Sequence, residues 1–263
     1  MSVVVAIPAR YESSRYPGKP LVALRGASGT PKTLVQRTYE AAAAARGIDR
    51  VIVATDDERI ASHCRGFGAE VMMTSPSCRN GTERCAEVLA NLTDHPDLVV
   101  NVQGDAPLTP PHFIEALVDG CGDCDVATPV LRCDLIMLER FRADRRNGQV
   151  GGTLAVTDRR QRALYFSKEI IPFADAIDTE EAAREIFHHV GLYAYRPRAL
   201  GQYLSWAEGI LETREGLEQL RFLEHGASIA CVEVDGRGRS FWELNNPVDV
   251  PRIESALAAM GIE

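Results

Sequence analysis

The 263-residue chain is 45% hydrophobic and 25% charged, as expected of an ordinary globular protein. Its formal net charge of −8 at pH 7 argues against broad nucleic-acid binding but allows a small anionic ligand in a local basic pocket. No run reaches the roughly 18 consecutive apolar residues of a membrane span. The seven cysteines, an odd and scattered set, indicate a reducing, cytoplasmic compartment.

Short apolar segments alternate with helical patterns over the first 130 residues. Strands are predicted at residues 3–7, 51–54, 70–73, 98–102 and 126–130, and helices include 32–46 and 58–64. Because these strands lack a polar face, helices must cover both sides of the sheet. The pattern predicts an α/β fold of Rossmann-like type, with a mostly parallel twisted sheet.

Beyond Pro129 the pattern changes. A charged stretch, 132–146, is followed by strand-like segments at 153–156, 163–167 and 191–195, and then by helices at 216–225 and 247–261. No long linker or repeat interrupts the chain. We therefore expect one domain, 1–263, with an inserted mixed α+β lobe at 131–235.

The loop after the first strand concentrates cations. Residues 8–20 carry Arg10, Arg15 and Lys19 together with serines, proline and glycine. Guanidinium, ammonium and backbone N–H groups in a turn suit a triphosphate. The loop has neither the GxxxxGK[ST] nor the GxGxxG order. Composition alone leaves a solvated surface loop equally open.

The motifs of this loop, PAR, SSR and PGKPL, resemble the amino-terminal signature of the 3-deoxy-manno-octulosonate (Kdo) cytidylyltransferases, or CMP-Kdo synthetases. Further blocks follow in the family's order: TDD at 55–57, NGTER at 80–84, NVQGD at 101–105, ALYFS at 163–167, HVGLY at 189–193 and LEQLR at 217–221. The resemblance implies transfer of CMP from CTP to a small acidic acceptor, with release of pyrophosphate.

The resemblance also implies roles for individual residues. Catalysis falls to Arg10, Lys19 and Asp105, and CTP binding to Arg10, Arg15, Lys19, Asn80, Gly81, Thr82, Arg84 and Gln103. The acceptor contacts are Tyr165, Lys168, His189, Glu218 and Gln219. Asp105 and Asn245 are the expected ligands of Mg²⁺, which prefers oxygen donors. The resemblance further implies that 1–263 is a single nucleotidyltransferase domain and that the lobe at 131–235 serves acceptor binding and dimerisation. We expect a homodimer that binds neither nucleic acid nor a membrane.

Several positions depart from the family's pattern. Ala106 replaces a carboxylate beside Asp105, Asn245 replaces an aspartate, Lys168 replaces an arginine and Gly151 replaces a lysine. These changes leave two acceptor classes open: a Kdo-type sugar acid, or a phosphonate such as phosphonoformate. Two other hypotheses remain, a CTP-binding regulatory homologue without turnover and a nucleotidyltransferase of other base specificity. The single Cys121–Cys124 CxxC pair lacks zinc-site partners.

Overall fold

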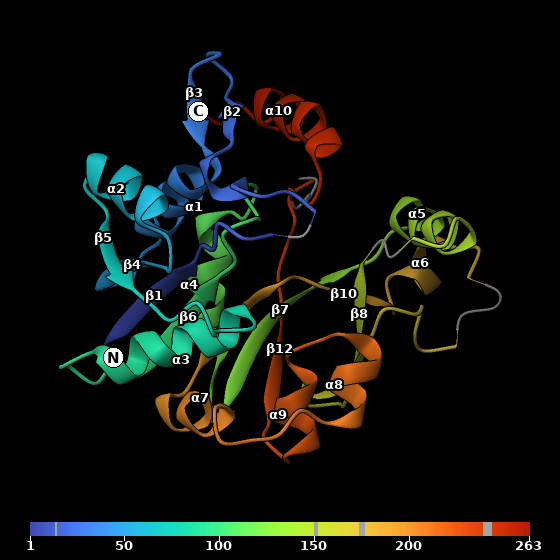
Figure 1. Cartoon of the computed structure of the whole chain (residues 1–263). Coiled ribbons are helices and arrows are strands. Elements are labelled where there is room, and N and C mark those ends of the chain that lie inside the picture. Colours follow the sequence, from blue (N-terminus) through green and yellow to red (C-terminus); the bar gives the residue numbers. More distant parts are fainter. Residues whose placement is uncertain (14, 150–151, 174–176, 239–243) are drawn as a thin grey trace.

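The computed structural model describes residues 1–13, 15–149, 152–173, 177–238 and 244–263. One sheet of ten strands crosses these described residues (Figure 1). Its order is β5 (Glu70–Met73), β4 (Arg50–Thr55), β1 (Val3–Pro8), β6 (Leu98–Val102), β11 (Leu192–Tyr195), β7 (Val126–Arg132), β10 (Phe187–His189), β8 (Thr153–Thr157) and β9 (Ala163–Ser167), with β12 (Ile229–Glu233) paired to β7.

The first half of the sheet is parallel. Strands β5, β4, β1 and β6 pair in parallel, and β11 lies antiparallel between β6 and β7. All five strands predicted in the first 130 residues are present. The expected α/β class with a mostly parallel sheet is confirmed.

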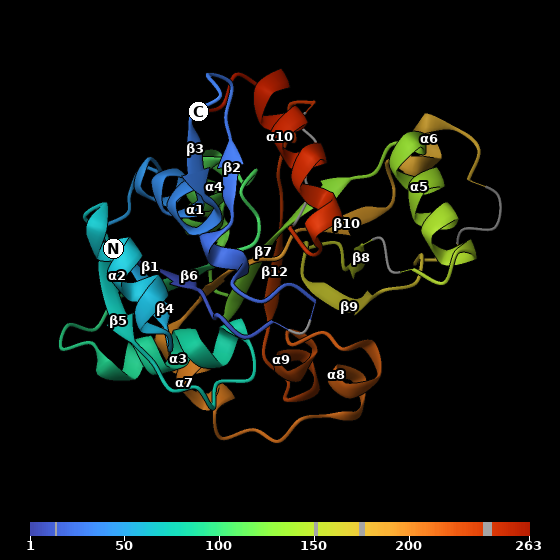
Figure 2. The same cartoon turned by 45° about the horizontal axis from the view of Figure 1, so that its top comes forward.

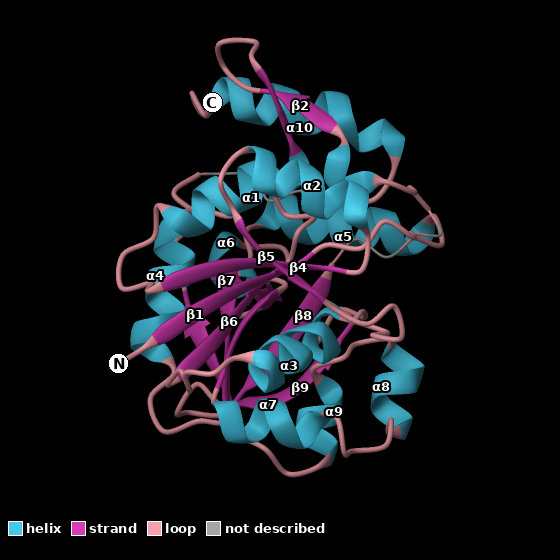
Figure 3. Cartoon of the chain, turned by 60° about the vertical axis from the view of Figure 1, so that its left-hand side comes forward, coloured by secondary structure: helices cyan, strands magenta, loops and turns pink. Residues whose placement is uncertain are grey.

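Helices cover both faces of the sheet (Figure 3). Helices α1 (Leu34–Ala43), α2 (Glu58–Gly66) and α4 (Pro111–Gly120) lie on one face, and α3 (Gly81–Asn91), α7 (Pro197–Tyr203) and α9 (Leu220–Glu224) lie on the other. The side chains of β1 alternate between two cores: Val3, Val5 and Ile7 face the first group of helices, and Val4 and Ala6 face the second. This double burial explains the continuous apolar sequence of β1.

Two predicted helix starts were wrong, those at residues 32 and 216, whereas the last helical segment starts at Pro247 as predicted. Residues Pro31–Thr33 form β3, which pairs with β2 (Ala23–Arg25), and Thr33 caps α1 by accepting from the Gln36 N–H. Gly216 has a φ of 62° and ends α8 (Ile210–Glu215), because glycine adopts the left-handed conformation at a helix C-terminus without strain. The last helix begins as a 3₁₀ turn, Pro247–Asp249, and continues as α10 (Val250–Ala259).

A smaller group of elements stands beside the main sheet (Figures 1 and 2). Helix α5 (Leu135–Arg146) and helix α6 (Glu180–Ala183) pack around their own apolar cluster, which includes Leu138, Phe141 and Ile186. Strands β10, β11 and β12 fall within 131–235 but belong to the large sheet. The role of that segment as an acceptor-binding and dimerisation lobe stays a prediction. Within the described residues, no helix is long and apolar enough to cross a membrane.

A glycine allows the ends of β1 and β6 to approach each other. A Cβ atom on Gly104 would lie 2.6 Å from the carbonyl oxygen of Pro8, a backbone atom that cannot move aside cheaply. We expect Gly104→Ala to lower the free energy of unfolding by about 1–3 kcal/mol through this overpacking. Thermal or urea unfolding measures the change.

Gly201→Ala is the matched control. Gly201 lies within α7, and a Cβ atom there would have no neighbour within 4 Å. Alanine should therefore leave stability unchanged or raise it by roughly 0.5–1 kcal/mol. Equal effects of the two substitutions would contradict the steric explanation for Gly104.

Candidate active site

A polar pocket of about 200 Å³ opens where the carboxyl ends of β1 and β6 meet the start of α3. This edge of a parallel sheet is where open α/β folds bind ligands. Its lining residues are Pro8, Ala9, Arg10, Ser13, Arg15, Lys19, Pro20, Cys78, Arg79, Asn80, Gly81, Arg84, Gln103, Gly104 and Asp105. Most of the predicted nucleotide-binding residues therefore share one cavity.

The first loop is held in a closed turn. Gly18, with a φ of 70°, donates its N–H to the carbonyl of Tyr11 over 2.9 Å. The guanidinium of Arg59, from α2, stacks on the Tyr11 ring at 3.3 Å from its centroid. The turn thereby presents its cations to the pocket. Arg10 is exposed there and forms no ion pair with any residue that the structure describes.

Lys19 and Asp105 join the two sides of the pocket. The Lys19 ammonium donates to Asp105 Oδ2 over 2.8 Å, and the two side chains are 15% and 27% exposed. Asp105 follows β6 directly after the closely packed Gly104, as expected for a residue at a strand's carboxyl end. Its carbonyl accepts from the Leu244 N–H over 2.8 Å.

The hydrogen bond between Leu244 and Asp105 brings the segment that starts at Leu244 close to the first loop. Arg15 donates to Asn245 Oδ1 over 3.0 Å, so the residue after Leu244 contacts the cationic loop. The two predicted metal ligands, Asp105 and Asn245, therefore come from adjoining segments. Gly151, one of the departures from the family pattern, lies outside the described residues, as does Ser14 of the SSR motif.

The start of α3 is a second wall. Asn80 caps this helix, because its Oδ1 accepts from the Glu83 N–H over 2.8 Å, and its Nδ2 donates to the Tyr203 hydroxyl over 3.1 Å. A Cβ atom on Gly81 would lie 3.0 Å from Gln103 Nε2, which explains the glycine. Arg84 is only 3% exposed; it pairs with Asp56 Oδ2 at 3.3 Å and donates to the Thr74 hydroxyl. Arg84 forms no ion pair with Glu83 or Glu87, its neighbours on the same helix.

Glu218, one of the predicted acceptor residues, also contacts the start of α3. Its two carboxyl oxygens accept from the Thr82 N–H over 3.3 Å and from Gln103 Nε2 over 3.2 Å. Burial raises the pKa of Glu218 to about 7, against the opposing effect of these donors. Thr82 also shares a hydrogen bond with the Tyr195 hydroxyl at 2.8 Å.

None of the five predicted acceptor residues, Glu218 included, belongs to the cavity lining. His189 is 6% exposed, and its Nε2 lies 2.9 Å from Thr128 Oγ1. Burial, with a smaller contribution from His188, lowers the pKa of His189 to about 3, so it is neutral at pH 7. Gln219 is 1% exposed, and its Oε1 accepts from the Tyr193 hydroxyl. Its buried Nε2 has no hydrogen-bond partner among the residues that the structure describes.

Tyr165 and Lys168 meet at the end of α8. The Tyr165 hydroxyl donates to Glu215 Oε1 over 3.3 Å, and the Lys168 N–H donates to Glu215 Oε2 over 2.9 Å. A Cβ atom on Gly216 would lie 2.9 Å from Lys168 Nζ, which places this ammonium beside the turn that leads to Glu218.

Sequence reasoning missed part of the site. Arg79 lines the pocket and pairs with Glu83, yet no motif pointed to it beyond its place before NGTER. Arg221, the last residue of LEQLR, was quoted without a role but is 1% exposed and binds Glu212 through two hydrogen bonds. The available signal was that Arg221 ends the LEQLR block, which resembles the family's sequence.

The oxygen donors of Asp105 and Asn245 suit a metal ion that takes most of its other ligands from water and substrate. Among the described residues, no group of three His, Cys, Asp or Glu side chains surrounds a common point. Asp105 supplies one carboxylate, and the amide oxygen of Asn245 already accepts from Arg15. Mg²⁺ is usually held by one or two carboxylates together with substrate phosphates and waters, so these residues suit Mg²⁺ better than zinc.

Comparison with known proteins places this architecture in a family. The family model described as "Cytidylyltransferase" matches residues 4–229. The 3-deoxy-manno-octulosonate cytidylyltransferase of Maricaulis maris is 42% identical over 264 residues, which cover 99% of this chain and 99% of that protein. This chain belongs to the 3-deoxy-manno-octulosonate cytidylyltransferase family. As a member of that family, it is a CTP-dependent nucleotidyltransferase.

Two further comparisons extend the family assignment. The 3-deoxy-manno-octulosonate cytidylyltransferase of Arabidopsis thaliana is 39% identical over 97% of this chain and 83% of its own length. A solved structure of CMP:2-keto-3-deoxy-manno-octonic acid synthetase complexed with CTP superposes with a TM-score of 0.84 at 32% identity, covering 99% of this chain and all of the other. The 4-diphosphocytidyl-2C-methyl-D-erythritol synthase of Anaerococcus prevotii, at 13% identity and a TM-score of 0.58, shares the fold alone.

The raised pKa of Glu218 makes stability depend on pH. Between its ordinary pKa of 4.5 and its folded-state pKa of about 7, the folded protein holds a proton that the unfolded chain has lost. The contribution of this carboxyl is therefore most favourable below pH 4.5 and declines as pH rises through 7. Glu218→Gln cannot ionise, so its stability relative to the wild type should rise by about 1–3 kcal/mol from pH 4.5 to pH 8.

Unfolding of both proteins over this pH range measures the difference, in which other titrating groups cancel. Glu58→Gln, at the exposed ion pair with Arg65 on α2, is the control and should show a much smaller change. A stability difference for Glu218→Gln that is constant with pH would show that Glu218 titrates like an exposed carboxyl.

Proposed function

We propose that this chain transfers CMP from CTP to 3-deoxy-manno-octulosonate, or to a closely related sugar acid, and releases pyrophosphate. The observation that carries the proposal is the arrangement around one pocket. The triphosphate-suited loop and Asp105 belong to its lining, and Glu218 adjoins that lining through its hydrogen bond with Gln103. Similarity to 3-deoxy-manno-octulosonate cytidylyltransferases over nearly the whole chain supports the choice of acceptor.

The nucleotide side needs alignment and charge neutralisation rather than a nucleophilic side chain. An acceptor oxygen attacks the α-phosphorus of CTP, a new P–O bond forms, the bond to the β-phosphate breaks, and pyrophosphate leaves. Arg10 and Lys19 bind the phosphate oxygens and stabilise the charge that develops on the leaving group. Arg15, which is tied to Asn245, orients the loop.

Mg²⁺ would be held by Asp105 and by CTP phosphate oxygens, with Asn245 as a neutral donor. When bound, the ion supplies positive charge that neutralises the triphosphate. With the Asp105 carboxylate bound to the cation, the Lys19 ammonium would be available to a phosphate oxygen of CTP.

Selection of the base falls to groups around Gly81. The side-chain amide of Asn80 is occupied by the helix cap and by Tyr203, so its backbone is the part available to cytosine. Gln103 donates through Nε2 to Glu218 and keeps Oε1 as an acceptor for the cytosine amino group.

Pyrophosphate release tests the proposal. Purified protein is supplied with Mg²⁺, each of CTP, UTP, GTP and ATP, and an acceptor panel of Kdo, other sugar acids and phosphonates including phosphonoformate. We expect release with CTP and Kdo, and loss of roughly 100-fold or more in kcat/KM for Lys19→Ala, which removes a phosphate-binding cation. Arg65→Ala, remote on α2, is the control.

Each other outcome excludes the proposal in a different way. Turnover with phosphonoformate but not Kdo would favour the phosphonate acceptor to which Ala106 and Asn245 point. Faster turnover with UTP or GTP would overturn the base assignment. Tight CTP binding without release for any acceptor would favour a regulatory homologue.

Asn245→Asp tests the neutral donor at the metal position. Because a carboxylate attracts the cation more strongly than an amide, the Mg²⁺ concentration for half-maximal rate should fall by several-fold, roughly three to ten. Mg²⁺ titrations of the initial rate measure it. Asn91→Asp, at the far end of α3, adds the same charge away from the pocket and should leave the requirement unchanged. An unchanged requirement in Asn245→Asp would remove this residue from the metal site.

A further inference from the structure

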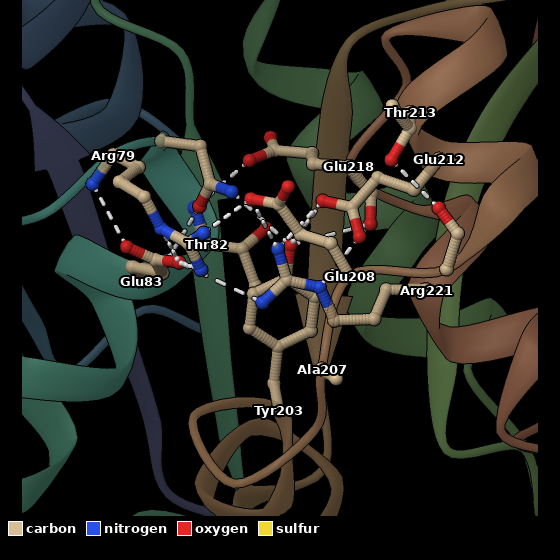
Figure 4. Close-up of polar contacts among 12 residues, drawn as sticks. Arg79, Thr82, Glu83, Tyr203, Ala207, Glu208, Glu212, Thr213, Glu218 and Arg221 are labelled. Carbon is tan, nitrogen blue, oxygen red and sulfur yellow. Dashed lines mark hydrogen bonds and ion pairs between the residues drawn. The ribbon is translucent and has the colours of Figure 1, made fainter.

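A buried arginine links helix α3 to helices α7 and α8 (Figure 4). Arg221, on α9, is 1% exposed. Its Nε and NH2 each donate a hydrogen bond of 2.6 Å to a carboxylate oxygen of Glu212. Its guanidinium lies over the Tyr203 ring, 4.1 Å from the centroid. Glu83 and Glu208 complete its surroundings, each 3.6 Å from a guanidinium nitrogen.

This group crosses between distant parts of the chain. Glu83 belongs to α3, Tyr203 to α7, Glu212 to α8 and Arg221 to α9. On the α3 side Glu83 also binds Arg79, which lines the pocket and reaches Glu208. We call Arg221, Tyr203, Glu83 and Glu212 the arginine hub.

The Tyr203 hydroxyl contacts both Asn80, in the pocket lining, and the backbone of Glu218. It accepts from Asn80 Nδ2 over 3.1 Å, and it lies 3.4 Å from the carbonyl oxygen of Glu218 and 3.4 Å from Glu212 Oε1. A hydroxyl has one proton, so it donates to one of these two oxygens at a time while accepting from Asn80. Asn80 caps α3 in the pocket wall, and Glu218 begins the turn on the acceptor side.

The energetic cost of the hub indicates a purpose beyond stability. A guanidinium stays charged at any accessible pH, so its burial requires matched carboxylates and well-formed hydrogen bonds. Replacement of buried ion pairs by apolar side chains of similar volume is often neutral or stabilising, so their better-attested use is to specify one geometry. Here that geometry is the separation of the Asn80 cap from the Glu218 turn.

We propose that the arginine hub is a positioning device that fixes the nucleotide-side residues Asn80–Thr82 against the acceptor-side residues Glu218 and Gln219. None of its four members needs to touch a substrate. The hub sets the distance between the α-phosphorus and the attacking oxygen, a quantity to which transfer rates are highly sensitive. The acceptor half of this inference rests on the proposed function, whereas the nucleotide half needs only CTP binding.

Tyr203→Phe is the decisive variant. It removes the hydroxyl that reaches Asn80 and Glu218 and keeps the ring beneath Arg221. We expect CTP to bind about three- to tenfold more weakly in calorimetry without acceptor, as for the loss of one or two hydrogen bonds. We also expect kcat with Kdo to fall by roughly tenfold or more, with the melting temperature within a few degrees of the wild type.

Tyr39→Phe is the matched control. Tyr39 lies on α1, on the opposite face of the sheet, where its ring packs against Phe67. The same hydroxyl deletion there should leave CTP affinity, kcat and both KM values unchanged. Arg221→Lys is the second test: it keeps a positive charge but cannot bind Glu212 in the same two-bond manner or stack on Tyr203, so it should lower kcat at least as far as Tyr203→Phe.

Wild-type CTP affinity and kcat in Tyr203→Phe would overturn the proposal, whatever happens in Arg221→Lys. A lowered melting temperature with unchanged kinetics in the folded protein would overturn it as well, because that is the signature of a purely structural role. If wild-type protein turns over none of the acceptors, the proposed function fails, yet the CTP affinity of Tyr203→Phe still decides the nucleotide half.

Discussion

The ion pair between Lys19 and Asp105 joins the two halves of the active site. It links the loop after β1 to the turn after β6, two segments that the parallel sheet brings to the same edge. A partly exposed pair contributes only about 1 kcal/mol to stability. The pair keeps an ammonium and a carboxylate together in the cavity lining, where we propose that the triphosphate and its cation bind. Gly104 makes the close approach of the two strands possible.

Near the start of α3, the main physical constraint is that buried carboxylates need positive or hydrogen-bonding partners. Glu83, Glu212 and Glu218 gather near the start of α3 in a chain whose net charge is already negative. Arg221 offsets the first two, while Glu218 relies on neutral donors from Thr82 and Gln103, and burial therefore raises its pKa. This region thus combines one cluster of paired charges with one carboxyl, that of Glu218, whose pKa is about 7.

The structure shows which groups surround two of the residues that depart from the family pattern, Asn245 and Lys168. Asn245 lies against the Arg15 guanidinium, and the backbone of its neighbour Leu244 pairs with Asp105. The cavity lining therefore includes one carboxylate, Asp105, among its described residues. Lys168 lies beside Gly216 and binds Glu215 through its backbone, so a shorter-reaching cation borders the turn that carries Glu218.

The sequence by itself determined the α/β class, the five strands of the first 130 residues and the cationic loop, because apolar periodicity and motif order are local properties. It also indicated Asp105 at a strand end. Tertiary structure alone decided which groups these side chains contact. The Asn80 amide bonds to its helix cap and to Tyr203, and His189 is buried and neutral. Arg221 bridges α3 to α8. Such contacts join residues that are far apart in the chain, or depend on burial, and packing of the whole sheet and its helices brings them together.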